Sequence, residues 1–232
     1  MKIFAISDLH ISTNTNKPMD VFGENWVDYL DKIRADWQEK VTDDDIVLVG
    51  GDISWAMTID DAKKDVSTFS DLKGKKVLIK GNHDYWWSGI GKVRDMLPEN
   101  FFALQNDSIR FDGVVICGSR CWSVPGSPDF NQQDMKIYLR ETERLKLSLK
   151  DAQKLKQDGD KLIALIHFPP FNVRREDSLF TSIFEEFKVD SVIYGHLHGK
   201  NVRADKLVIK NNIKYYLTSC DQVNNKLTEI LL

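Results

Sequence analysis

Short apolar runs rich in β-branched residues recur along the chain, and polar loops and helical patterns separate them. Six of these runs are continuous and are bounded by glycine or aspartate, which is typical of strands buried on both faces of a sheet. They span residues 3–6, 46–49, 77–79, 114–117, 162–166 and 191–194. The alternation of strand and helix patterns predicts an α/β fold.

The helical patterns and the C-terminal third of the chain complete this prediction. Apolar residues at helical spacing predict helices over residues 25–39, 59–72, 132–157 and 178–187. After Gly199 the pattern changes to strand-like runs at 206–209, 215–218 and 227–231, joined by Asn-rich turns. These runs predict hairpins, so we expect a mixed sheet. No repeat or flexible linker divides the chain, and residues 1–232 are expected to form a single domain.

Composition narrows the classes of function. Hydrophobic residues make up 42% of the chain and charged residues 29%, the balance of a globular protein with a sizeable core. The net charge of −3 and the absence of a basic stripe argue against a dedicated nucleic-acid binder. No apolar run reaches the length of a membrane span or of a signal-peptide core. Three cysteines without a CxxC pair suit a reducing compartment, so a cytoplasmic protein is expected.

The five histidines all fall at the ends of predicted strands. They are His10, His83, His167, His196 and His198, and Asp52 occupies the same position after the second strand. The carboxyl ends of the strands in an open α/β sheet face one crevice, where ligands bind. A lone histidine is more often a hydrogen-bonded structural residue, but five at one edge predict a shared site.

Imidazole and carboxylate groups together suit manganese, iron, zinc or nickel rather than magnesium or calcium. His196 and His198 are two residues apart on an extended segment, so their side chains project in opposite directions and could serve two different ions. Asp8 and His10 have the same spacing, but in a tight loop both could reach a single ion. Asp52 offers two oxygens and could bridge. The expected cofactors are therefore metal ions, and the sequence does not specify which metal they are.

The chain resembles the calcineurin-like metallophosphoesterases in motifs that follow the order of that family. The motifs are Asp8-Leu9-His10, Gly51-Asp52, Gly81-Asn82-His83-Asp84, His167 and Gly195-His196-Leu197-His198. The resemblance implies a four-layer α/β/β/α sandwich with mixed sheets. It also implies two metal ions, one held by Asp8, His10, Asp52 and His198, and the other by Asp52, Asn82, His167 and His196. His83 would then face the substrate as a catalytic residue, with Asp84 placed to orient it.

The expected function is hydrolysis of a phosphate mono- or diester, with a small molecule such as a nucleotide as substrate and with no membrane or nucleic-acid partner. In the mechanism that we expect, a hydroxide shared by the two ions attacks phosphorus, and His83 stabilises charge or protonates the leaving oxygen. The residues after Asp52 depart from the Asp-Arg-Gly motif of the Ser/Thr protein phosphatases, so protein phosphatase activity is not expected. A non-catalytic metal-binding scaffold of the same fold and a nuclease are the alternatives.

Several aromatic and basic residues near the motifs are candidates for substrate binding. Trp55, Trp86, Trp87 and Trp122 either form an aromatic rim for a flat substrate group or cap the core, and the sequence does not separate these interpretations. Arg120 and Arg174 are candidates for a phosphate contact, with ordinary exposed arginine as the alternative. The charges on the 132–157 segment, such as Glu141 with Arg144, are interpreted as a solvated helix face.

Overall fold

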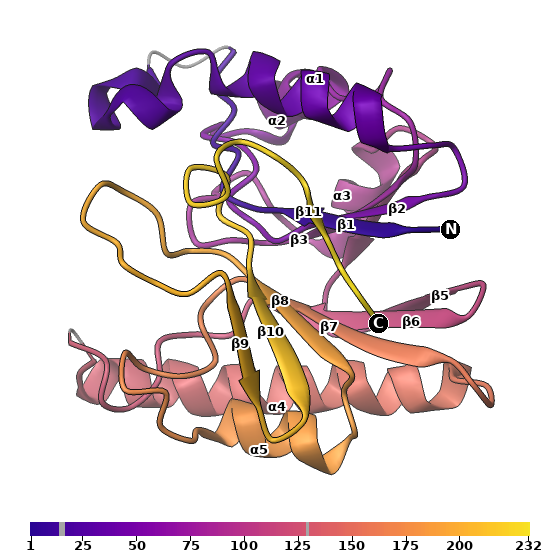
Figure 1. The fold of residues 1–232 in the computed structure, drawn as a ribbon, viewed down its shortest axis with the longest axis vertical. Helices are drawn as coiled ribbons and strands as arrows, with labels where there is room; N and C mark the ends of the chain where they lie inside the picture. The colour runs from indigo at the N-terminus through magenta and orange to yellow at the C-terminus, as the bar shows by residue number, and fades with distance from the viewer. Residues whose placement is uncertain (14–16, 129) are drawn as a thin grey trace.

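The computed structural model describes residues 1–13, 17–128 and 130–232, which form two β-sheets with helices on their outer faces (Figure 1). The first sheet has the strand order β11-β1-β2-β3-β4, and the second has the order β5-β6-β7-β8-β10-β9. The strands of the first sheet are β1 (Ile3–Ile6), β2 (Ile46–Val49), β3 (Lys75–Ile79), β4 (Phe101–Leu104) and β11 (Thr228–Glu229). Those of the second are β5 (Ser108–Phe111), β6 (Val114–Ser119), β7 (Lys161–Ile166), β8 (Ser191–Tyr194), β9 (Leu207–Lys210) and β10 (Ile213–Leu217).

Both sheets are mixed. In the first sheet β1 to β4 are parallel and only β11 is antiparallel to its neighbour. In the second, β6, β7, β8 and β10 are parallel, while β5 and β9 form antiparallel edges. The expected mixed α/β fold class is confirmed.

Five α-helices are present in the described ranges. They are α1 (Tyr29–Lys40), α2 (Ile59–Ser67), α3 (Ile90–Met96), α4 (Gln132–Leu155) and α5 (Leu179–Glu186). Figure 1 shows α1 and α2 beside the first sheet. It shows α4 and α5 on the face of the second sheet that is turned away from the first. None of the helices in the part of the chain described here is both long and apolar enough to cross a membrane.

Three apolar clusters show why the strands read as continuous hydrophobic runs. Successive side chains of a strand point to opposite faces of the sheet. Ile3 and Ala5 of β1 therefore join a cluster that includes residues of both sheets, whereas Phe4 and Ile6 pack in a cluster with residues of α1, α2 and α3. A third cluster lies between the second sheet and helices α4 and α5. Each central strand is buried on both faces.

The differences from the sequence-based elements occur where periodicity is weak. Helix α3 and strands β4 and β5 were not predicted, since α3 is short and contains Gly91, and β5 is only half-buried. The predicted helix over 59–72 ends at Ser67. The last strand does not form a hairpin with β10 but pairs with β1 in the other sheet, because Leu227 and Ile230 pack into the clusters on either face of that sheet.

Lys76 on β3 gives a testable consequence of this packing. Its ammonium group is fully buried, donates to the Leu72 carbonyl and lies 5.1 Å from the centroid of the Phe101 ring. Burial lowers the pKa of Lys76 from 10.5 to about 8. Between these two pH values the unfolded chain binds a proton that the folded chain has released, so the stability of the wild type rises with pH.

We expect Lys76→Met to raise the free energy of unfolding by about 1–3 kcal/mol at neutral pH, with a gain that shrinks toward about pH 10. Urea denaturation at the two pH values measures this difference. Lys75→Met, at the half-buried start of the same strand, is the matched control. A gain for Lys76→Met that does not depend on pH would contradict burial of the charge as its cause.

Candidate metal centre

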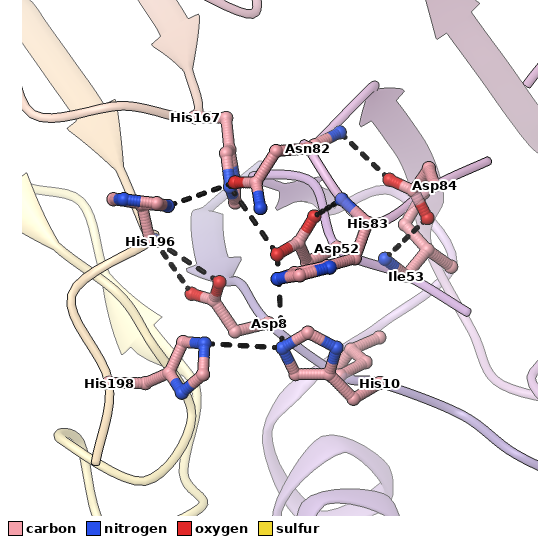
Figure 2. Close-up of polar contacts among 12 residues, drawn as sticks. Asp8, His10, Asp52, Ile53, Asn82, His83, Asp84, His167, His196 and His198 are labelled. Carbon is pink, nitrogen blue, oxygen red and sulfur yellow. Dashed lines mark hydrogen bonds and ion pairs between the residues drawn. The ribbon is translucent and has the colours of Figure 1, made fainter. Parts of the chain in front are cut away.

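The loops that follow five parallel strands meet at one edge of the two sheets. β1 leads to Asp8 and His10, and β2 leads to Asp52. Asn82 and His83 follow β3, His167 follows β7, and His196 and His198 follow β8. Figure 2 shows these side chains converging from both sheets. The sheets are also joined here, since Ser7 N donates to Thr218 O at 2.8 Å and Cys220 N to Ser7 O at 3.0 Å.

One half of the cluster consists of Asp8, His10, Asp52 and His198. Each offers a donor atom, and these atoms all lie within 4.8 Å of one another. The Nε2 atoms of His10 and His198 are 3.4 Å apart, and His10 Nε2 lies 3.8 Å from Asp52 Oδ2. These four side chains could hold one metal ion.

The other half is built around Asn82. Its Oδ1 atom lies 2.8 Å from His167 Nε2 and 2.9 Å from His196 Nδ1. His167 Nε2 is also 3.5 Å from Asp52 Oδ2, the same oxygen that faces His10. Asp52 therefore lies between the two halves and could contribute to both.

Contacts outside the cluster orient its side chains. His167 Nδ1 donates to the Gly50 carbonyl oxygen at 2.8 Å. The lone pair of the ring is therefore on Nε2, which faces Asp52 Oδ2. The backbone N–H of His83 donates to Asp52 Oδ1 at 2.7 Å, and that of His196 donates to Asp8 Oδ2 at 3.0 Å. The ring of Trp55 stacks on His10, with 4.7 Å between the centroids. These contacts hold the side chains of Asp8, His10, Asp52 and His167 in place within the protein itself.

The electrostatics of the cluster favour a bound cation. Burial raises the pKa of Asp8 well above its usual value, and the charge of Asp52 adds to this. Burial also raises the pKa of Asp52 to about 6 and lowers that of His167 and His196 to about 3. Asp52 Oδ2 and His10 Nδ1 are buried and have no hydrogen-bond partner among the described residues. Two buried carboxylates, neutral imidazoles and an unpaired oxygen between them fit a site for divalent metal ions.

The backbone at the site is strained. Asp8, His10, Asp52 and His196 have φ angles of 59°, 45°, 51° and 68°, a region that non-glycine residues rarely occupy. Gly81 is required for a different reason, because a Cβ there would collide with the backbone and carboxylate of Asp52. Such strain is concentrated at functional sites, where the surrounding structure enforces it.

His83 lies at the rim of the cluster. Its ring is half-buried and packs against Trp55, with 4.6 Å between centroids, and it lies 5.7 Å from the His10 ring. Its Nδ1 atom has no hydrogen-bond partner among the described residues. The ring can therefore reach a molecule bound over the cluster without serving as one of the ligands.

The expectation that Asp84 orients His83 is wrong. Asp84 is fully buried and points away from the His83 ring. Oδ1 accepts from Ile53 N at 2.8 Å, Ser54 N at 3.1 Å and Trp86 Nε1 at 3.1 Å, and Oδ2 accepts from Gly81 N at 2.8 Å. Asp84 thus joins the loop after β2 to the loop after β3, and so fixes Asp52 relative to Asn82.

We expect Asp84→Asn to lower both stability and metal affinity through this connection. An asparagine has one acceptor oxygen and would turn a donor toward one of these N–H groups, which costs about 1–3 kcal/mol of unfolding free energy. Metal affinity should fall because the two loops loosen. Thermal unfolding with and without added manganese measures both effects. Unchanged stability and unchanged metal affinity would contradict the proposed connection.

The side chains of the residues predicted to bind substrate do not join the metal-centre cluster. Trp87 is only 4% exposed and packs in the core, which favours the core interpretation for this residue. The Arg174 side chain is exposed and pairs with Glu176. Arg120 is closer, since its carbonyl accepts from His167 N at 3.2 Å, but its guanidinium is directed toward Glu141, 3.7 Å away. Glu141 itself is buried, so its interpretation as part of a solvated face is wrong.

Sequence reasoning missed two residues that support the site. Cys220 Sγ lies 3.2 Å from the Asp8 carbonyl, and the Asp221 carboxylate accepts from Gly199 N at 2.7 Å. The charge of Asp221 also opposes the burial that lowers the pKa of His198. Both residues follow the end of β10, so the rule that identified the histidines could have identified them too.

Comparison with known proteins gives a match to one family and a similar fold in several solved structures. The family model for calcineurin-like phosphoesterases matches residues 1–200. No curated protein matches the chain at a significant level. Among solved structures, the protein TT1561 of Thermus thermophilus has a TM-score of 0.61 at 12% identity, with 98% of this chain and 97% of that chain covered. A protein of unknown function from Aquifex aeolicus has a TM-score of 0.54 at 15% identity, with coverage of 98% and 95%.

Proposed function

The chain belongs to the calcineurin-like phosphoesterase family, and on this basis we propose that it hydrolyses phosphate esters with two metal ions held at the cluster. One ion would be held by Asp8, His10, Asp52 and His198. The other would be held by Asp52, Asn82, His167 and His196. Manganese, iron, zinc and nickel suit these nitrogen and oxygen donors.

The bound ions would supply a nucleophile near neutral pH by lowering the pKa of water, and would polarise phosphate oxygens. The protein's own contribution is to hold the ligand set. Asp52 orients toward both halves because the His83 N–H fixes its other oxygen. His167 presents Nε2 because the Gly50 carbonyl binds Nδ1. The loops are held in register by Asp84.

His83 would act on the substrate. Its ring stands beside the cluster, and it can donate a proton or a hydrogen bond to an oxygen of the ester. Burial lowers the pKa of His83, while the charge of Asp52 opposes this shift. The neighbouring carboxylate thus offsets only part of the effect of burial, and the pKa of His83 stays below its ordinary value.

The observation that carries the proposal is the position of Asp52 Oδ2, which is buried, lacks a hydrogen-bond partner in the described part of the chain and faces both His10 and His167. An activity panel tests the proposal: the protein supplied with manganese, zinc, iron or nickel is assayed on p-nitrophenyl phosphate and bis(p-nitrophenyl) phosphate, then on nucleotides and cyclic nucleotides. We expect hydrolysis that chelation abolishes.

Metal binding without hydrolysis of any ester would favour the non-catalytic scaffold instead. Cleavage of single- or double-stranded DNA would favour a nuclease. The net charge of −3 supports a small substrate over a nucleic acid.

A further inference from the structure

A cavity lies beside the candidate metal centre, where the ends of β3, β4 and β6 meet helix α4. Its volume is about 290 Å³. Four basic side chains line it, namely Lys80, Arg120, Arg140 and Arg144. Among the described residues that line it, Glu141 is the only acidic one. The cavity therefore carries an excess of positive charge in a chain whose net charge is negative.

Glu141 organises the three arginines but does not neutralise them. Its buried Oε1 lies 2.7 Å from Arg144, 3.5 Å from Arg140 and 3.7 Å from Arg120. The side chains of Arg140 and Arg144 remain 55% and 44% exposed, so their guanidinium groups keep N–H donors that Glu141 does not use. Lys80 is tethered from the other side, since its Nζ donates to the Trp87 carbonyl at 3.0 Å.

The cavity adjoins the half of the metal centre that contains Asn82 and His167. Lys80 is two residues before Asn82. The carbonyl of Arg120 accepts from the backbone N–H groups of His167 and Phe168, at 3.2 and 3.1 Å. These connections place the cavity next to the metal centre, within reach of a ligand that extends from one to the other.

We propose that this cavity binds a second phosphate group of the substrate, away from the ester bond that is cleaved. Guanidinium groups bind phosphate oxygens with paired hydrogen bonds, and three of them beside a lysine match the charge of a phosphate monoester. The single carboxylate of Glu141 balances the charge of only one of the four basic groups that line the cavity. This assignment rests on the proposed phosphoesterase function for its catalytic meaning, but the binding of an anion does not depend on it.

Binding is tested without catalysis by titrating chelator-treated protein with inorganic phosphate. We expect the wild type and Lys150→Gln, a control on the exposed face of α4, to bind phosphate equally. Arg144→Gln and Arg140→Gln should each weaken binding about tenfold, because each variant loses a hydrogen bond between two charged groups. Arg140→Gln guards against a folding defect, because Arg140 is the more exposed of the two. Wild-type affinity in both arginine variants would overturn the proposal.

The substrate assignment is tested with the p-nitrophenyl ester of thymidine 5′-phosphate, with and without a 3′-phosphate. We expect the ratio of kcat/KM for the doubly phosphorylated ester to that for the simpler ester to fall about tenfold in Arg144→Gln and to stay unchanged in Lys150→Gln. An unchanged ratio in Arg144→Gln would overturn the assignment. If metal-loaded wild type hydrolyses neither ester, the proposed function fails, and the phosphate titration alone decides whether the cavity binds an anion.

Discussion

Asp52→Asn is expected to abolish hydrolysis, with a loss of kcat/KM of about 10³-fold or more. The reason is the position of this carboxylate, since one oxygen lies 3.8 Å from His10 Nε2 and 3.5 Å from His167 Nε2. Removing its charge would weaken the metal sites of both halves and so remove several kcal/mol of charge stabilisation, at about tenfold per 1.4 kcal/mol. Steady-state kinetics with saturating metal measures the loss.

Asparagine is the appropriate replacement because its Oδ1 can still accept the His83 backbone N–H. In the absence of metal, Asp52→Asn should be at least as stable as the wild type, because the charge of Asp52 raises the pKa of buried Asp8. Added manganese should then raise the Tm of the wild type much more than that of the variant. If the variant keeps wild-type activity, Asp52 is not shared between two ions.

His83→Ala is expected to lower kcat about 10²–10⁴-fold while the protein keeps its metal content, since general acid and base groups contribute a factor of this size. The ring contacts Trp55 and stands beside His10. The His83 backbone, which positions Asp52, is unaffected by the substitution. Metal analysis of the purified variant, together with its kinetics, separates loss of catalysis from loss of metal.

The choice of ester also distinguishes the two roles that His83 could have. If His83 protonates the leaving oxygen, His83→Ala should affect p-nitrophenyl esters less than alkyl esters, because p-nitrophenolate leaves without a proton. If it stabilises charge on phosphate oxygens, both esters should be affected alike. Tyr85→Ala, an exposed neighbour on the same loop, is the control and should change little. Wild-type turnover in His83→Ala would remove this residue from the mechanism.

The meeting of the histidines was predictable from sequence because each follows a short β-branched run that is typical of a buried strand. β-branched residues fix the strands β1, β2, β3, β7 and β8, and parallel strands bring their carboxyl ends to one edge. The expected two-ion ligand sets came from the family resemblance, not from periodicity. The structure brings these side chains together, but their roles as ligands remain a proposal.

Contacts that depend on side-chain direction were not predictable. Asp84 is adjacent to His83 in sequence, yet the turn directs its carboxylate to the N–H groups of Ile53 and Gly81 instead. Glu141 belongs to a highly charged helix, and its charge indicated a solvated position, although its place three residues after Tyr138 and four before Leu145 is on the buried face. It is buried because the ends of β3 and β6 bring Lys80 and Arg120 to that face of α4. Such tertiary contacts override local patterns of charge.

Anomalous diffraction from crystals of the protein soaked in manganese would show directly whether two ions bind at the cluster. We expect two peaks at the shared edge of the sheets, one among Asp8, His10 and His198 and the other among Asn82, His167 and His196, with the Asp52 carboxylate between them. A map with no peak at this edge under any of the four metals, or with ions bound only elsewhere on the chain, would contradict this expectation.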